Sequence, residues 1–279
     1  MSRTYTARNF PAAHVMNPSP DLQFFVDNAI AMRKAGVNLP HLDHRLNLLN
    51  YIRIADDIMG QLPPPAAAGA GAGAPSILDW GCGYGQMSWL MKRRGLSMTS
   101  FDIGLADATL PAIPLCAGLE VTRSSHPTRL PFTDARFDAV LSCGVLEHVD
   151  ECSRIPGAER ASLTEIHRIL KREGRFLIYQ LPQRAAWQEA LMRRLRLGYF
   201  HPRRYSAAEI ASLLDAAGFD VVRLRRANFM PKNLTGLPEA VKRIYNRFSP
   251  FWMVLDKVLC ALPLINRLAG VMEITAVKR

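Results

Sequence analysis

The segment from Ser76 to Leu90, SILDWGCGYGQMSWL, most constrains the fold of this chain. A short apolar run ends in three alternate glycines, Gly81, Gly83 and Gly85, and a helix-forming stretch follows. Glycines at a strand-to-helix turn bring bare backbone close to a ligand, although tight turns need glycine whatever their function. Asp102 follows Gly81 at about the twenty-residue interval expected for a carboxylate that accepts both ribose hydroxyls. Together these features predict a nucleoside-bearing ligand at the turn.

Strand and helix patterns alternate from residue 76 onward, which predicts an α/β fold with a mostly parallel sheet covered by helices on both faces. Ser206 and Glu209 form a capping box that opens one of the helices, and Gly218 lies beyond its end. The expected strands are Ser76–Trp80, a segment ending at Phe101, Phe137–Ser142, Arg175–Gln180, Phe219–Leu224 and Met272–Val277.

The predicted domain organisation has three parts. Residues 1–62 form an N-terminal helical extension with two helices between 21 and 60, and residues 63–75, PPPAAAGAGAGAP, form a flexible Pro/Ala/Gly linker. Residues 76–279 form the main α/β domain. Residues 229–270 are far longer than the usual connection of about two to six residues, so they are a helical insertion before the last strand.

Composition leaves the partner open. The 279 residues, 49% apolar, are enough for a substantial core, and the five scattered cysteines suggest neither disulfides nor a zinc site. The N-terminus has no signal-peptide pattern, which predicts a cytoplasmic location. A net charge of +11 suits a nucleic-acid or anionic-membrane partner, but it is mostly arginine, and a GC-rich coding bias produces the same excess.

The glycine spacing narrows the cofactor. A dinucleotide fingerprint would require glycine where Gln86 stands, and no P-loop lysine is present. The G-x-G-x-G spacing resembles the first motif of class I methyltransferases, which bind S-adenosylmethionine. Three further segments, Leu130–Val149, Leu163–Ile178 and Tyr205–Phe219, are similar to the methyltransferase type 11 family, whose small-molecule branch includes quinone-biosynthesis enzymes. The resemblance implies a Rossmann-like methyltransferase fold with a seven-stranded sheet.

The resemblance also implies a set of cofactor-binding residues. The three loop glycines would line the methionine moiety, Asp79 would orient the loop or the amino group, and Asp102 would hold the ribose. Leu130 would lie near the adenine, where His126 replaces the family's usual aspartate. Ser142, at the end of the expected fourth strand, completes the set.

Two residues after that strand are predicted to carry the chemistry. His148 is the candidate base because its ordinary pKa lies near working pH, and Glu147 would orient an acceptor, unless both merely brace a helix. Tyr179 and His201 are secondary candidates for substrate contact, against sheet packing and a loop surface respectively. Some quinone methyltransferases hold a divalent cation with an acidic residue where this chain has Gly144, so no metal is expected.

The acceptor class depends on the insertion, whose most apolar part is Phe251–Gly270. Charged residues and a proline interrupt it well short of the about 20 apolar residues of a membrane span. Three interpretations stay open: an interfacial membrane contact through 242–270 at the inner face of the membrane, a pocket roof, or a packed helical pair.

The favoured activity is O-methylation of a small or lipid-linked acceptor. The alternative is a nucleic-acid methyltransferase or binder that uses the basic surface. Ser142 to Val145 replace the (D/N)-P-P-(Y/F) tetrad of base-amino methyltransferases, and no RNA-binding module is recognisable, so nucleic acid is disfavoured.

Overall fold

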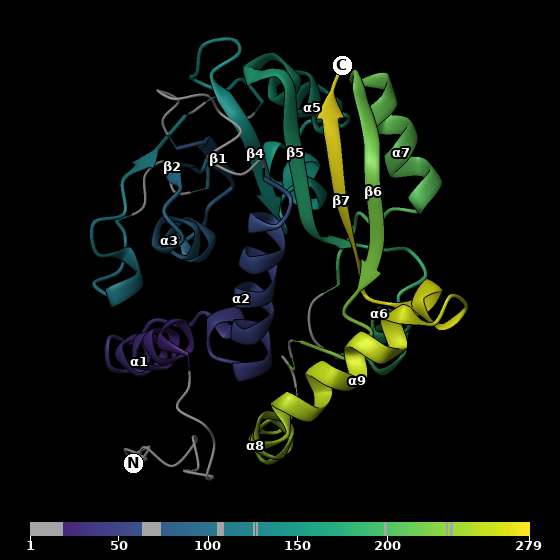
Figure 1. The fold of residues 1–279 in the computed structure, drawn as a ribbon. Helices are drawn as coiled ribbons and strands as arrows, with labels where there is room; N and C mark the ends of the chain where they lie inside the picture. The colour runs from purple at the N-terminus through teal and green to yellow at the C-terminus, as the bar shows by residue number, and fades with distance from the viewer. Residues whose placement is uncertain are drawn as a thin grey trace.

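The computed structural model describes residues 19–62, 74–104, 109–124, 126, 128–197, 200–232, 234 and 237–279. In this part of the chain a seven-stranded sheet with the order β3-β2-β1-β4-β5-β7-β6 forms the centre (Figure 1). The strands from β3 to β5 are parallel to their neighbours, whereas β7 is antiparallel to both β5 and β6. The strands are β1 Ser76–Trp80, β2 Ser97–Phe101, β3 Val121–Thr122, β4 Phe137–Cys143, β5 Leu170–Pro182, β6 Phe219–Ala227 and β7 Val271–Lys278. The predicted α/β class with a mostly parallel sheet is confirmed.

The helices follow the predicted alternation. They are α1 Pro20–Lys34, α2 Arg45–Met59, α3 Gln86–Arg93, α4 Val149–Ser153, α5 Ala158–Ile169, α6 Trp187–Leu195, α7 Ala207–Ala216, α8 Glu239–Arg247 and α9 Ser249–Ala261. The predicted capping box opens α7, because Ser206 Oγ accepts a hydrogen bond of 3.2 Å from the Glu209 backbone N–H and the Glu209 carboxylate accepts from Ser206 N–H. The elements that the sequence did not predict include β3, α4 and α6.

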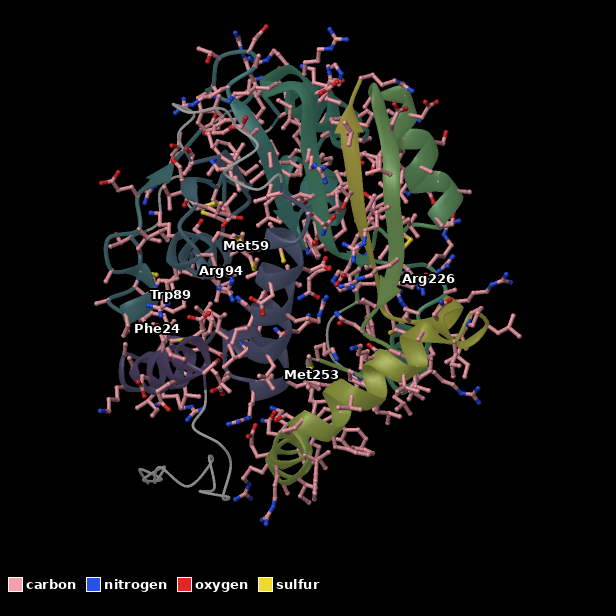
Figure 2. All side chains as sticks on the ribbon, in the orientation of Figure 1. Phe24, Met59, Trp89, Arg94, Arg226 and Met253 are labelled. Atoms are coloured by element: carbon pink, nitrogen blue, oxygen red, sulfur yellow. The ribbon has the colours of Figure 1, made fainter. Side chains whose placement is uncertain are left out.

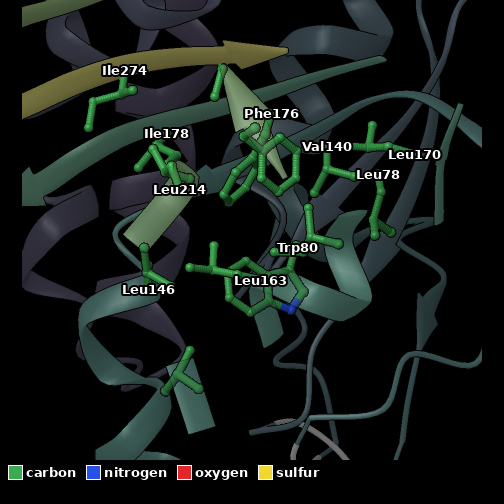
Figure 3. Close-up of a cluster of buried hydrophobic side chains, with 14 of the residues drawn as sticks. Leu78, Trp80, Val140, Leu146, Leu163, Leu170, Phe176, Ile178, Leu214 and Ile274 are labelled. Atoms are coloured by element: carbon green, nitrogen blue, oxygen red, sulfur yellow. The ribbon is translucent and has the colours of Figure 1, made fainter. Parts of the chain in front are cut away.

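Alternate residues of the strands pack on opposite faces of the sheet. Phe176 and Ile178 of β5 join a cluster with Leu163 of α5 and Leu214 of α7, which Figure 3 shows in close-up. Leu177, between them in sequence, belongs to a second cluster with the helices α1, α2 and α3. Successive residues of β5 therefore pack on alternate faces, as they must in a sheet that is buried on both faces.

The predicted N-terminal extension packs as a layer of the same domain over its described residues, 19–62. Leu48 and Ile54 of α2 are fully buried in the cluster that also holds Leu141 of β4. Phe24 of α1 stacks on Trp89 of α3 with ring centroids 3.8 Å apart, a contact labelled in Figure 2. The predicted linker lies outside the described residues from 63 to 73.

The insertion before β7 contains α8 and α9, which extend beyond the end of the sheet where β6 ends (Figure 1). Polar contacts hold them to the preceding segment. The Asp256 carboxylate accepts from the Met230 backbone N–H at 2.6 Å and pairs with Lys232 at 3.0 Å, and the Tyr245 hydroxyl donates to the Pro231 carbonyl at 3.0 Å. Among the described residues, no helix is long and apolar enough to cross a membrane.

Candidate active site

A cavity of about 850 Å³ runs along the edge of the sheet where the parallel strands end. Its walls come from the turns after β2, β1, β4 and β5, and from the start of β7, which is antiparallel and therefore begins at this edge. Ligands of open α/β sheets bind at the carboxyl ends of the strands. The neighbouring strand ends bring residues from distant parts of the sequence to one site.

The three glycines of the first turn have different roles. All have positive φ, at +72° for Gly81, +51° for Gly83 and +86° for Gly85. A Cβ on Gly81 would lie 2.5 Å from Val145 and one on Gly85 would lie 2.6 Å from Leu119, whereas one on Gly83 would meet no atom within 4 Å. Gly81 and Gly83 line the cavity, and Gly85 is the N-cap of α3. Gly83 therefore presents bare backbone to open space.

Asp102 joins this turn to the end of β2. Its Oδ2 accepts from Gly83 N–H at 2.8 Å, and its Oδ1 accepts from Gly104 N–H at 2.7 Å. A carboxylate has about four acceptor sites, and the residues that the structure describes use two of them, which leaves acceptor capacity for ligand hydroxyls. Asp102, Ile103 and Gly104 all line the cavity, which fits the predicted ribose contact.

Asp79 acts from inside the protein. It is 1% exposed, and its Oδ2 accepts from Ser88 Oγ of α3 at 2.6 Å. Burial raises the pKa of Asp79 to about 6, because water no longer stabilises the charged form. The hydrogen bond from Ser88 holds Asp79 against the first turn of α3.

The N-terminal helices supply part of the cavity wall through two residues that the sequence reasoning did not single out. Asn47 and Tyr51, one helical turn apart on α2, line the cavity beside Gln86 of α3. Burial raises the pKa of Tyr51, so its phenol stays neutral. The sequence feature that could have identified them is a polar and an aromatic residue four positions apart on a largely apolar helix, because this spacing puts both on one face.

Three further predicted cofactor contacts, His126, Leu130 and Ser142, lie outside the cavity wall. His126 is exposed, and its imidazole Nδ1 accepts backbone N–H bonds from Arg129 at 2.9 Å and Thr128 at 3.3 Å, so the ring folds onto its own turn. Leu130 is a core residue and Ser142 is fully buried. None of the three lines the cavity; Ile103 and Gly104, directly after Asp102, do.

The predicted catalytic residues come together with His201. Ligand atoms of Glu147, His148 and His201 lie within 4.8 Å of one another, and all three side chains line the cavity. His148 Nδ1 is 3.2 Å from Glu151 Oε2, and its Nε2 is 4.0 Å from Glu147 Oε1. His201 Nδ1 is 3.5 Å from Glu189 Oε2 on α6. This spacing could hold a divalent cation, so the expected lack of a metal stays a prediction.

Glu147 is the most perturbed member of the cluster. It is 3% exposed, and no described residue hydrogen-bonds its Oε2. Burial raises the pKa of Glu147 to about 7. Near neutral pH its carboxyl group can therefore either donate or accept a proton, which is the property of a catalytic acid or base.

Beyond this cluster the cavity wall becomes apolar. Side chains from α6 and from the segment before α8 form it: Trp187, Leu191, Met192, Leu195, Pro231, Leu234 and Leu237. The same elements also contribute polar lining residues, Gln188, Glu189 and Lys232, and Lys232 is paired with Asp256. Trp187 Nε1 donates to the Phe229 carbonyl at 2.9 Å, which ties α6 to the end of β6. The sequence reasoning missed α6 as a wall of the site.

Tyr179, a predicted substrate contact, does not line the cavity, because its side chain is 1% exposed and packs in the cluster that contains α2. Its hydroxyl donates to Asp57 Oδ2 and accepts from Gln61 Nε2, both at 2.6 Å. Asp57 also binds Arg223 through both carboxylate oxygens. Partial burial raises the pKa of Asp57, but hydrogen bonds from Arg223 and Tyr179 outweigh it and lower the value to about 2. Tyr179 is therefore a link between α2 and the sheet.

Sheet order, glycine turn and Asp102 together define a class of protein, the S-adenosylmethionine-dependent methyltransferases of Rossmann-like fold. The chain belongs to the methyltransferase domain family, whose profile matches residues 47–224. Its cofactor is S-adenosylmethionine. The open space at Gly83 and the acceptor capacity that the described residues leave on Asp102 fit a ligand with an amino-acid part and a ribose.

The chain is similar to individual proteins in sequence and in fold. The chain is 29% identical over 150 residues to a probable S-adenosylmethionine-dependent methyltransferase of Mycolicibacterium smegmatis, covering 52% of each protein. It is 27% identical over 185 residues to an uncharacterized protein of Methanocaldococcus jannaschii, covering 66% of this chain and 70% of that one. The fold matches a methyltransferase of Thermotoga maritima, described as a possible histamine N-methyltransferase, with a TM-score of 0.55, 15% identity and coverage of 91% and 99%.

Proposed function

We propose that this enzyme transfers a methyl group from S-adenosylmethionine to a hydroxyl oxygen of a small or lipid-linked acceptor with an apolar body. One observation carries the proposal. A proton-accepting cluster of Glu147, His148 and His201 shares a cavity with the glycine turn on one side and an apolar wall on the other. An acceptor whose apolar part rests on that wall would present its polar end to the cluster.

The cofactor supplies the electrophilic methyl group, so the chain must align the acceptor oxygen and remove its proton. His148 suits the second task. An imidazole that donates from Nδ1 to Glu151 keeps its lone pair on Nε2, on the side facing Glu147. The acceptor proton would pass to His148 Nε2 as the oxygen–methyl bond forms and the sulfur–methyl bond breaks. Glu147 and His201 would hold the acceptor hydroxyl in place.

The lining of the cavity favours this acceptor over nucleic acid. Nucleic-acid substrates are held chiefly through phosphates by arginine and lysine. The acceptor wall carries leucine, methionine and tryptophan, and its one lysine, Lys232, is already paired with Asp256. Burying the apolar part of a ligand against such a wall stabilises the complex by about 25 cal/mol per Å².

The experiment is methyl transfer from labelled S-adenosylmethionine to a matched panel of acceptors. The panel holds a hydroxylated aromatic, the same ring with an isoprenoid tail, its amino analogue, and single-stranded RNA. We expect the labelled methyl group on the oxygen of the hydroxylated compounds. Mass analysis of the products locates it. Label confined to the amine or to RNA would overturn the proposal.

His148→Ala should lower kcat by about 10² to 10⁴, because the general base is removed, and should leave the affinity for S-adenosylhomocysteine nearly unchanged. His126→Ala is the matched control, because this exposed histidine lies outside the cavity. Steady-state kinetics and calorimetry measure the two quantities. Full activity of His148→Ala would show that His148 is not the general base and only braces the helix.

A further inference from the structure

Exposed apolar side chains concentrate on α8, α9 and the turn that follows. Nine of the fourteen large apolar side chains that are exposed in the described part of the chain lie between residues 241 and 268. We name this set the α8–α9 apolar surface: Val241, Ile244, Phe248, Phe251, Val254, Val258, Leu262, Leu264 and Leu268. Exposed apolar patches of this kind mark interaction sites.

The surface is continuous along each helix. Val241, Ile244 and Phe248 follow one another at i, i+3 and i+7 along α8 and its C-cap, and α9 repeats the spacing from Phe251. Neither helix buries an apolar side chain, since Ser249 is their one buried residue. The inner side of α9 is held by Asp256, so the outer apolar side is not the core of a packed helical pair.

Cations surround these apolar side chains. Arg243, Arg247, Lys257 and Arg267 are exposed and form no ion pair among the described residues. Of the two acidic residues between 239 and 268, Glu239 is paired with Lys242, and Asp256 points inward to Lys232. The surface therefore combines apolar side chains with unneutralised positive charge.

We propose that the α8–α9 apolar surface docks on an anionic lipid bilayer, with its apolar side chains in the headgroup boundary and its cations on lipid phosphates. Amphipathic helices with apolar and basic faces bind membranes in this way. A second copy of the chain fits less well, because a symmetric contact would bring the same four cations against one another. The inference goes beyond the methyl-transfer chemistry and does not depend on it.

The surface adjoins the apolar end of the cavity. Leu191 and Leu195 of α6 line the cavity and are also exposed, at 44% and 53%. Trp187 of α6 is bonded to Phe229, and Met230, the next residue, is bonded to Asp256 of α9. Residues 229–230 therefore link α6, which forms part of the cavity wall, to α9, which carries part of the docking surface. If the proposed function holds, a membrane-held acceptor would enter the cavity between α6 and α9.

Vesicle flotation tests the docking without any acceptor. The full chain is mixed with vesicles of equimolar phosphatidylcholine and phosphatidylglycerol, and separately with phosphatidylcholine alone. We expect strong flotation with the anionic vesicles, weak flotation with the neutral ones, and release by high salt, which screens the charges. No flotation with anionic vesicles would overturn the proposal, whether or not the enzyme methylates a hydroxyl.

Variants separate the apolar and charged contributions. Phe251→Glu with Val254→Glu should reduce vesicle affinity by at least about tenfold, since each removes apolar area from the boundary and adds repulsion. Arg243→Gln should reduce it about fivefold. Val222→Glu is the control, because Val222 is 60% exposed on β6, away from this surface, and should float like the wild type.

Two further measurements keep the outcome interpretable. Circular dichroism and urea unfolding should match the wild type, because the substituted side chains are exposed in the folded protein. Analytical ultracentrifugation tests the competing occupant. A dimer that Phe251→Glu dissociates, in a protein that does not float, would show that a second copy covers the surface and would overturn the proposal.

Discussion

The two halves of the cavity are built in different ways. The cofactor half, at the ends of β1 and β2, comes chiefly from the segment 76–104, with Asn47 and Tyr51 of α2 beside it, and depends on backbone geometry at Gly81 and Gly83. The acceptor half is assembled from α6, from the segment after β6 and from the turn after β4, and depends on side chains. The cofactor is shared by a whole class of enzymes, whereas the acceptor differs from enzyme to enzyme. A local backbone turn therefore binds the cofactor, and side chains from several elements bind the acceptor.

The largest effect on the cofactor half should come from Asp102→Ala. It removes the carboxylate expected to hold the ribose hydroxyls, and each hydrogen bond to a charged group contributes about 1.5 to 3 kcal/mol. Calorimetry should show at least about a tenfold rise in the Kd for S-adenosylhomocysteine. Asp134→Ala, at a side chain 78% exposed and paired with Arg168, is the control. Unchanged affinity in Asp102→Ala would break the assignment of this half.

In the acceptor half, Glu147 should make the stability of the protein depend on pH. The pKa of Glu147 is raised to about 7, so the folded state binds this proton more tightly than the unfolded state does. Its contribution to stability is complete below about pH 4.5 and is lost as the pH rises through about 7. Glu147→Gln should therefore gain stability over the wild type above pH 7, by up to about 3 kcal/mol.

Urea unfolding at a series of pH values measures that difference. Glu165→Gln is a control of opposite sign, because the Arg168 hydrogen bond lowers the pKa of Glu165. That carboxylate stabilises the fold above its unfolded pKa and loses its contribution as the pH falls, so its replacement should cost stability at neutral pH. Parallel curves for Glu147→Gln and wild type would show that Glu147 is not desolvated, and its acid–base role would lose its basis.

The last comparison is between two glycines of the same turn. Gly85→Ala introduces a Cβ that clashes with Leu119 at a positive φ, whereas Gly83→Ala has a positive φ but open space. We expect Gly85→Ala to lose about 1 to 3 kcal/mol more stability than Gly83→Ala. Gly83→Ala should instead weaken cofactor binding, since its methyl group enters the cavity. Equal stability losses with normal binding would contradict the division of roles.

Much of the fold was predictable because its signals are local. The apolar run at Ser76–Trp80, the capping box at Ser206 and the alternation of strands and helices each depend on residues close in sequence. The two-residue strand β3 and the exposed helix α6 were not predicted, because neither has enough buried apolar residues to give a periodic hydrophobic pattern in the sequence. Pairing with β2 and the hydrogen bonds to Phe229 hold them in place.

By itself, the sequence determined the class of cofactor site, because the glycine turn and Asp102 are set by spacing along a strand–turn–helix unit. Only the tertiary structure decided the direction of each side chain. Tyr179 was predicted at the acceptor and faces α2, and His201, far from His148 in sequence, lies with its ring 5.7 Å away. The periodicity of a strand in the sequence shows that alternate residues face opposite sides of the sheet. Which residues line the cavity depends on the elements that pack against each side.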